Sequence, residues 1–262
     1  MNVVLIGSGN VAWNLGRLVK QPGHDIVQIM ARNGKTGTEL AYELDTESAS
    51  YWSILKRDAD IYIICVNDDA LPEVARELGE LKLKKGLVLH TSGTVPVDVL
   101  RGSSSKYGVL YPLQSLRYGA KDLPEIPFLV EGKDEDTTVA IKSFAHTLTA
   151  NIKAVSTEQR QKMHLAAVLV NNFANFLFIQ AEEWCIKNNL DFRQLIPLIR
   201  ETGLRMDAGN PKGLQTGPAI RNDVTTIDLH RKLLADDPEL LGLYDRFTKG
   251  IMMMREKMGL VT

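Results

Sequence analysis

The sequence predicts an α/β domain with a doubly wound parallel sheet, followed by an all-helical C-terminal domain. Three observations predict this class. Short apolar runs alternate with segments of helical periodicity through residues 1–155. A glycine-rich turn follows the first apolar run. From Ser156 onward no strand pattern recurs. Strands that alternate with helices form parallel sheets with right-handed crossovers, so residues 1–155 are predicted as one domain and 156–262 as the other.

The individual elements follow from the apolar periodicity and from the turn residues that interrupt it. Strands are expected at 2–6, 26–30, 60–66, 86–90, 107–111, 126–130 and 151–155. Helices are expected between them at 10–20, 36–44, 71–81 and 134–148. The second domain is expected to hold helices at 156–188, 191–206, 223–235 and 238–258. Ser156 and Gln159 have the spacing of a capping box at the start of the long helix.

The charge balance and the cysteines exclude several classes of protein. Thirty-one basic and 32 acidic residues leave a net charge of -1, which gives no electrostatic reason to expect nucleic acid or an anionic membrane as partner. No segment is expected to cross a membrane, and residues 1–6 lack the basic start of a signal peptide. Cys65 and Cys185 have no metal-binding spacing and are interpreted as free thiols. We therefore expect a cytoplasmic protein.

The glycine-rich turn fits the pattern G-x-G-x-x-G/A between a strand and a helix. The first glycine permits the tight turn, the second lets a pyrophosphate approach the backbone, and the final alanine allows close packing. The free N–H groups of the helix start would then face the phosphates. The pattern predicts a Rossmann-like dinucleotide site, with a purely structural turn as the alternative. Its residues are Gly7, Ser8, Gly9, Asn10, Val11 and Ala12.

The choice between NAD and NADP is made after the second strand, where an acidic residue binds the ribose hydroxyl and an arginine accepts a 2′-phosphate. Asp25 precedes that strand and so belongs to the opposite edge of the sheet. Arg32 follows the strand, and its guanidinium can bind a phosphate bidentately. Lys35 adds charge, and Asn33 lies between the two. The sequence therefore favours NADP over NAD, with a solvated basic turn as the alternative.

Asn67 follows the third strand, at the carboxyl edge where ligands bind to open α/β sheets. We expect it to contact the cofactor. The neighbouring Asp68 and Asp69 are expected to cap the next helix.

Hydride transfer needs a proton donor, or a charge that polarises the acceptor, near the nicotinamide. His90, Thr91, Ser92 and Gly93 directly follow the fourth strand and suit that position. His90 is a candidate donor and Ser92 a candidate substrate ligand. The alternative is a turn whose hydroxyls cap the next segment.

The long helix is so apolar over residues 163–179 that we expect it to be buried on nearly all sides. In a regular α-helix His164, Asn171 and Asn175 share one face. Buried polar groups require hydrogen-bond partners. His164 and Asn171 are therefore candidates for a catalytic or binding role, and an interhelical or dimer-interface network is the alternative.

Two more polar groups are candidates for binding substrate. Arg221 lies with Asp223 in the predicted first turn of a helix, and it pairs either with Asp223 or with an anionic substrate group. Gln114 lies after a short edge strand and would orient the substrate, unless it belongs to a plain loop. No spacing of histidines and cysteines indicates a metal site.

Taken together, the whole chain resembles a bacterial group of oxidoreductases with a Rossmann-like N-terminal domain and a helical C-terminal domain of unassigned function. It is more distantly similar to pyrroline-5-carboxylate reductase, prephenate dehydrogenase and 3-hydroxyisobutyrate dehydrogenase. The resemblance implies the fold, a nicotinamide cofactor and dimerisation through the helical domain. The hydroxyacid dehydrogenases carry a catalytic lysine with an asparagine one turn on, but here Lys162 is followed by Ala166. The motifs that carry the resemblance are 7–12, 90–93, 111–114, 164–172 and 216–223.

The sequence thus predicts an NADP-dependent oxidoreductase that transfers a hydride between nicotinamide and a small carbonyl, imine or hydroxyacid. The alternative is a sensor or scaffold that binds NADP without catalysis. A homodimer through the C-terminal helices is expected, because a long apolar helix in a domain of about 105 residues needs additional cover.

Overall fold

The computed structural model describes residues 1–83 and 85–259. Contacts divide the chain into two compact units. We call Met1–Phe173 the N-terminal unit and the chain from Ala174 onward the C-terminal unit. The last strand ends at Ala154, and the first unit ends nineteen residues later at Phe173, within a continuous helical segment.

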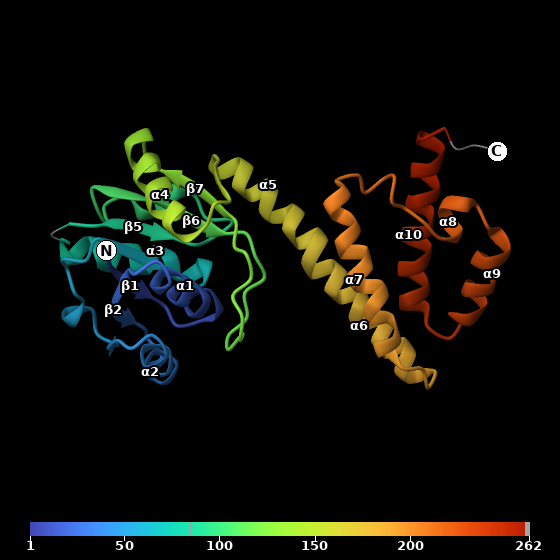
Figure 1. Ribbon diagram of the computed structural model, residues 1–262, viewed down its shortest axis with the longest axis horizontal. Helices are drawn as coiled ribbons and strands as arrows, with labels where there is room; N and C mark the ends of the chain where they lie inside the picture. The colour runs from blue at the N-terminus through green and yellow to red at the C-terminus, as the bar shows by residue number, and fades with distance from the viewer. Residues whose placement is uncertain (84, 260–262) are drawn as a thin grey trace. The chain divides into compact units, whose positions relative to one another are not determined.

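The N-terminal unit is built on an eight-stranded sheet (Figure 1). Its strand order is β3-β2-β1-β4-β5-β6-β7-β8, in which β1 to β6 run parallel. This confirms the doubly wound sheet. Strand β7 runs antiparallel to β6, which the alternating pattern does not predict. The strands are β1 (Asn2–Ile6), β2 (Asp25–Met30), β3 (Ser48–Ala49), β4 (Ile61–Ile64), β5 (Leu87–His90), β6 (Lys106–Pro112), β7 (Phe128–Gly132) and β8 (Ile152–Ala154).

Helices cover both faces of this sheet. Side chains of α1, α2 and α4 share one buried cluster with every second strand residue, such as Leu5 and Ile63. The intervening residues, such as Val4 and Tyr62, face α3 in a second cluster. The apolar strands thus bury both faces, as parallel strands do. The helices are α1 (Asn10–Lys20), α2 (Gly34–Glu43), α3 (Leu71–Leu81) and α4 (Glu135–Leu148), with 3-10 helices η1 (Trp52–Ile54), η2 (Asp68–Ala70) and η3 (Val97–Leu100).

The register brings the carboxyl ends of the central strands to one edge. Ile6 pairs with Ile64, and Ile64 pairs with His90. His90 in turn pairs with Val109, so Tyr111 lies just beyond it on β6. The loops that leave β1, β4 and β5 therefore begin side by side.

The remaining helical segment and the C-terminal unit contain no strand among the described residues. The predicted capping box begins the long helix, with Ser156 and Gln159 each bonding the other's backbone N–H. A π-helical turn interrupts that helix, so its residues depart from regular α-helical spacing. The elements are α5 (Thr157–Ala167), the π-helix η4 (Val168–Asn172), α6 (Phe173–Lys187), η5 (Phe192–Leu195), α7 (Ile196–Leu204), η6 (Arg205–Ala208), α8 (Pro218–Arg221), α9 (Val224–Leu233) and α10 (Pro238–Lys257).

The burial expected for residues 163–179 is wrong for the single chain. Leu165 is 60% exposed and Val170 is 76% exposed, and Asn171 and Asn175 are exposed as well. One helix among the described residues has the length and composition of a membrane span, which the sequence analysis did not anticipate. Thr157–Lys187 has a window of mean hydropathy 1.3 and is long enough to span a bilayer. One such helix is weak evidence for a membrane, because core helices of soluble proteins meet the same criterion.

Candidate functional site

A cavity of about 360 Å³ opens at the carboxyl edge of β1, β2 and β4. It is bordered by the glycine-rich turn, by the basic turn after β2 and by the loop after β4. Its lining includes Gly7, Ser8, Gly9, Arg32, Asn33, Trp52 and Asn67.

Gly7 is required by the backbone at this edge. Its φ is +114°, and its N–H donates to the carbonyl of Met30 at 2.7 Å. A Cβ at this position would lie 2.3 Å from the carbonyl oxygen of Cys65. Gly9, in contrast, has no atom within 4 Å of the position of a Cβ. The turn thus closes tightly at Gly7 and leaves open space over Gly9, where a ligand can approach the main chain.

The start of α1 offers free main-chain donors. Gly9 is the N-cap and provides no side-chain cap, and no acidic residue lies in the first turn. The first N–H groups of a helix carry partial positive charge, which favours an anion. The side chains of Ser8 and Asn10 are already engaged, with Thr36 Oγ1 at 2.6 Å and with the N–H of Tyr118 at 2.9 Å. These main-chain amides fit a dinucleotide pyrophosphate.

The close packing that the motif implies is also present. Ala12 is fully buried, and Val11 packs against the cluster beneath it. A Cβ at Gly16, one turn further on, would lie 2.4 Å from Leu44 Cδ1. Small residues here hold the helix start close to the sheet.

The basic turn after β2 presents one unengaged guanidinium. Arg32 is exposed and makes no hydrogen bond or ion pair in the described part of the chain. Asn33 caps α2, and its Oδ1 accepts from the N–H of Lys35 at 3.1 Å. Lys35 itself is exposed and does not line the cavity.

The loop after β4 differs from its prediction. Asn67 lines the cavity, but neither Asp68 nor Asp69 caps α3, whose N-cap is Ala70. The carboxylate of Asp68 accepts instead from the hydroxyl of Thr94. The expected capping role is therefore wrong, because the chain makes a 3-10 turn before α3 begins.

His90 ends β5 as a fully buried side chain. Its Nδ1 accepts from the N–H of Ser92 at 3.2 Å, and its Nε2 has no partner among the described residues. Burial, and then the positive charge of Arg160, lower the pKa of His90 to about 3. The ring is therefore neutral at pH 7. This arrangement favours a structural role for His90 over proton donation.

Ser92 serves the same loop. Its Oγ accepts from the N–H groups of Thr94 at 3.1 Å and Val95 at 3.0 Å. That geometry matches a turn whose hydroxyls cap the following segment.

His164 reaches the loop from α5 and meets a residue of β6. Its Nδ1 lies 2.9 Å from the hydroxyl of Tyr111, and the two rings meet edge to face. A Cβ at Gly93 would lie 2.7 Å from the same nitrogen, so only glycine leaves room for His164. Burial raises the pKa of Tyr111, which keeps its hydroxyl protonated. The pair joins a partly exposed imidazole to a phenol.

A buried ion pair fixes the helix that carries His164. Arg160 is fully buried and bonds Glu131 of β7 and the carbonyl of Val95. Glu131 also accepts from the N–H of Thr157 at 2.9 Å, at the first turn of α5. These bonds tie the start of α5 to the sheet and to the loop after β5, one turn before His164.

The other predicted residues occupy different surroundings. Gln114 bonds the carbonyl of Glu125 and the N–H of Ser115, so its amide is satisfied within its own loop. Asn171 is exposed in the π-helical turn. Arg221 ends α8 and lies 4.0 Å from Asp223, which caps α9. Placing both in one first turn was wrong, because the chain breaks between the two helices.

Sequence reasoning did not select Tyr111, Glu131 or Arg160. Tyr111 belongs to the motif 111–114, in which only Gln114 was predicted to bind substrate. Arg160 lies four residues after the capping Ser156, near the helix N-terminus where the helix dipole disfavours a basic side chain, and this position is a signal for an acidic partner.

A doubly wound sheet, a positive-φ glycine and an uncapped helix start define a dinucleotide-binding protein of the Rossmann type. Residues 2–92 match the family described as NADP oxidoreductase coenzyme F420-dependent, and residues 126–251 match the Domain of unknown function (DUF2520). The chain is 36% identical to a provisionally named NADP oxidoreductase of Bacteroides fragilis, over 96% of this chain and 98% of that chain, with a TM-score of 0.88. The chain therefore belongs to this family of NADP oxidoreductases with an attached domain of unknown function.

More distant structures share the fold alone. A protein of Thermotoga maritima is 21% identical over 97% of this chain and 99% of its own, with a TM-score of 0.78. A 1-pyrroline-5-carboxylate reductase of Streptococcus pyogenes is 14% identical over 97% of this chain and 98% of its own, with a TM-score of 0.63. No curated protein matches the sequence. These findings confirm the family resemblance and the Rossmann-like fold.

Proposed function

We propose that this protein is an NADP-dependent oxidoreductase that acts on a small carbonyl, imine or hydroxyacid. The observation that carries the proposal is the His164–Tyr111 pair at the carboxyl edge of the sheet that also bears the dinucleotide turn. When bound, the nicotinamide supplies or accepts the hydride. The chain's own residues bind the cofactor and donate a proton to the substrate.

The cofactor is held by the free N–H groups at the start of α1, with Gly7 shaping the turn and Gly9 leaving the approach open. Asn67 borders the same cavity. We propose that Arg32 binds the 2′-phosphate and so selects NADP over NAD, because Arg32 lines the cavity and makes no hydrogen bond or ion pair with any residue that the structure describes. Lys35 does not line the cavity, and we propose that it contributes only its positive charge.

We assign proton donation to the pair formed by His164 and Tyr111. Nδ1 of His164 lies 2.9 Å from the hydroxyl of Tyr111, and in the imidazolium form its Nδ1–H donates to that hydroxyl oxygen while a second proton sits on Nε2. His164 would give the Nε2 proton to the substrate oxygen or nitrogen and return to the neutral imidazole, which keeps its bond to Tyr111. Tyr111 acts through His164 and is a positioning residue. We propose that Asn171, which is exposed in the π-helical turn, binds a polar group of the substrate.

The cofactor assignment is tested by the variant Arg32→Ala. Removing one charged bidentate contact should weaken NADPH binding by about 10- to 100-fold, and NADH binding by less than about twofold. Isothermal titration calorimetry measures both. Arg101→Ala is the matched control, since Arg101 is an exposed arginine near the opposite edge that pairs with Asp98. Equal losses for both cofactors would remove Arg32 from the selection of NADP.

The catalytic assignment is tested by His164→Gln, with turnover measured by NADPH oxidation across small ketones, imines and ketoacids. We expect kcat to fall by about 10²- to 10⁴-fold, as for loss of a general acid, with NADPH affinity unchanged. Tyr111→Phe should lower kcat less and shift its pH profile. Tight NADPH binding without turnover by the wild-type protein on any of these substrates would favour the non-catalytic sensor.

We further propose that the protein works in a reducing compartment such as the cytoplasm. Both cysteines are free and buried, and burial raises the pKa of Cys65 to about 12, which disfavours the reactive thiolate.

A further inference from the structure

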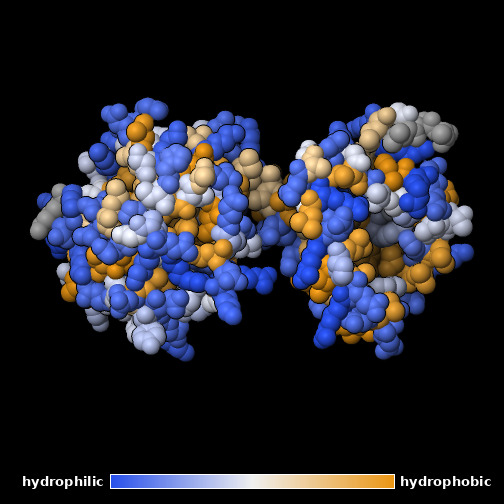
Figure 2. Space-filling view, in the orientation of Figure 1, coloured by the Kyte–Doolittle hydropathy of each residue, from blue (hydrophilic) through white to orange (hydrophobic). Residues whose placement is uncertain are grey.

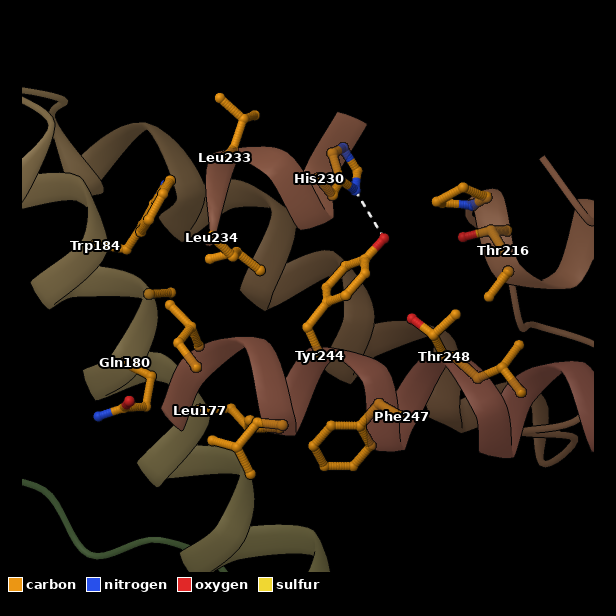
Figure 3. Close-up of a pocket in the computed structure, with 16 residues that line it drawn as sticks. Leu177, Gln180, Trp184, Thr216, His230, Leu233, Leu234, Tyr244, Phe247 and Thr248 are labelled. Carbon is orange, nitrogen blue, oxygen red and sulfur yellow. Dashed lines mark hydrogen bonds between the residues drawn. The ribbon is translucent and has the colours of Figure 1, made fainter. Parts of the chain in front are cut away.

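The C-terminal unit contains a cavity to which the proposed function assigns no role. It has a volume of about 560 Å³ and lies between α6, α9 and α10 (Figure 3). Figure 2 shows apolar side chains around a hollow on this unit. Pockets that hold small organic ligands are mostly apolar and have volumes of about 300–1,000 Å³. The cavity therefore has the size of a small-molecule site.

The walls of the cavity follow from helical periodicity. Leu240, Tyr244 and Thr248 line it at four-residue intervals on α10, so that one face of this helix turns toward it. Trp184 lines it from α6 and Leu233 from α9. Three separate helices thus contribute apolar side chains to one space.

A further wall comes from the motif 216–223, which is one of the motifs that carry the family resemblance. Thr216, Pro218 and Ala219 line the cavity, and Ala219 is buried. Gly217 between them has a φ of +103°, a conformation that favours glycine, and so shapes the turn that leads into α8. The cavity gives this motif a role that the cofactor site does not.

The lining selects against charged ligands. None of the described residues that line the cavity is an aspartate, glutamate, lysine or arginine. A charged ligand would lose its hydration there without an opposite charge to replace it. The imidazole of His230 is already engaged, because its Nδ1 lies 2.9 Å from the hydroxyl of Tyr244 and the two rings meet edge to face. The cavity therefore favours an uncharged molecule.

One buried hydroxyl in the lining has no partner within the described chain. Thr248 is 5% exposed, and its hydroxyl makes no hydrogen bond with any described residue. In Figure 3 this hydroxyl points from α10 into the cavity, on the same face of the helix as Tyr244. Most buried hydroxyls in folded proteins have a hydrogen-bond partner, since burial removes them from water. A carbonyl or hydroxyl oxygen of a ligand would supply that partner.

We propose that this cavity binds an uncharged small molecule with an apolar body and one carbonyl or hydroxyl oxygen, such as an aryl or branched aliphatic ketone or alcohol. The body packs against Trp184 and Leu233, and the oxygen accepts a hydrogen bond from the hydroxyl of Thr248. The site shares no lining residue with the cofactor cavity, so it does not depend on the proposed function.

Titration of the full chain, followed by ligand-observed NMR, tests the class of ligand. Acetophenone and 1-phenylethanol should bind at least about tenfold more tightly than benzoate and benzylammonium, which have similar rings but carry a charge. Equal affinity for the charged and uncharged probes would overturn the proposal. So would the absence of binding by both uncharged probes, which is the result expected if a protein surface fills the cavity.

The variant Thr248→Val tests the hydrogen bond, because it removes the hydroxyl and nearly preserves the shape of the side chain. It should weaken acetophenone binding by about 2- to 10-fold and leave the binding of toluene, which has no oxygen, unchanged. Thr202→Val is the matched control, since Thr202 is exposed on α7, lies outside the lining and bonds the carbonyl of Leu198 in its own helix. Equal effects of the two variants on acetophenone binding would contradict the contact with Thr248.

The variant Ala181→Phe tests the location of the site. Ala181 lines the cavity from α6, and a phenylalanine there should fill the space and abolish the binding of acetophenone and toluene alike. Circular dichroism checks that the variant folds, and its NADPH affinity should equal that of the wild-type protein. The cofactor site is thereby tested separately. Acetophenone binding that survives in the folded variant would place the ligand elsewhere and overturn the proposal.

Discussion

The two units contain similarly apolar sequences but differ in what covers them. In the N-terminal unit, strand residues such as Leu5 and Ile63 are fully buried between layers of helices. In the C-terminal unit, Phe176 of an equally apolar helix is 49% exposed. Burial in the first unit is complete within one chain, because a sheet offers two faces and helices cover both. Among the described residues of the second unit, several helices expose apolar side chains. Apolar periodicity thus predicts that a helix has an apolar face, but not whether the same chain covers that face.

The largest expected effect comes from truncating one phenylalanine in each unit to alanine. Phe128→Ala should lower the free energy of unfolding by about 3–5 kcal/mol, because the ring is fully buried and its loss leaves a cavity. Phe176→Ala should lower the free energy of unfolding by less than about 0.5 kcal/mol, because this ring is already 49% exposed. Urea unfolding at several protein concentrations separates these outcomes. Equal, concentration-independent losses would show that α6 is buried within its own chain.

A smaller effect is expected where the sheet holds the start of the long helix. Arg160→Met leaves the half-buried Glu131 without its charged partner and should cost about 3 kcal/mol of stability. Lys162→Met removes an exposed pair with Glu158 on the same helix and should cost less than about 0.5 kcal/mol. Adding Glu131→Gln to Arg160→Met should recover part of the loss. Thermal unfolding measures the stability of all three variants. Equal losses for the Arg160 and Lys162 variants would contradict the role of Arg160 in fixing the start of the long helix.

The smallest effect concerns pH and the buried imidazole of β5. In the folded chain the pKa of His90 is lowered from 6.5 to about 3, so the unfolded chain binds the extra proton between these values. Stability should therefore rise with pH across this window and fall by about 2 kcal/mol as the pH drops from 6.5 to about 5. His90→Gln should flatten this slope. Chemical unfolding at a series of pH values measures it, and an unchanged slope would mean that His90 is accessible to solvent.

Much of the N-terminal fold was predictable because its signals are local. The helix 71–81 was predicted with its exact bounds, and the capping box at Ser156 and Gln159 was predicted correctly. The short edge strand Ser48–Ala49 was not predicted, since two residues carry no periodicity. The antiparallel direction of β7 was also missed, because strand direction depends on how the connecting loop crosses the sheet edge.

The candidate site also combines features that local sequence predicts with features that depend on contacts between distant residues. The glycine turn was recognised because each of its residue types has a local conformational cause, as Gly7 demonstrates with its positive φ. The partnership of His164 with Tyr111 joins residues 53 positions apart and depends on the bonds of Arg160. The regular helical spacing used for Asn171 failed because a π-helical turn intervenes.

Local sequence signals were enough to predict the order of the longer strands and helices, the dinucleotide turn and the nearly neutral charge balance, because propensity, periodicity and backbone sterics act over a few neighbouring residues. Only the tertiary structure decided that the buried His90 is neutral, that His164 meets Tyr111, and that the apolar helices end at the surface. Those outcomes depend on desolvation and on contacts between distant segments, which no short stretch of sequence contains.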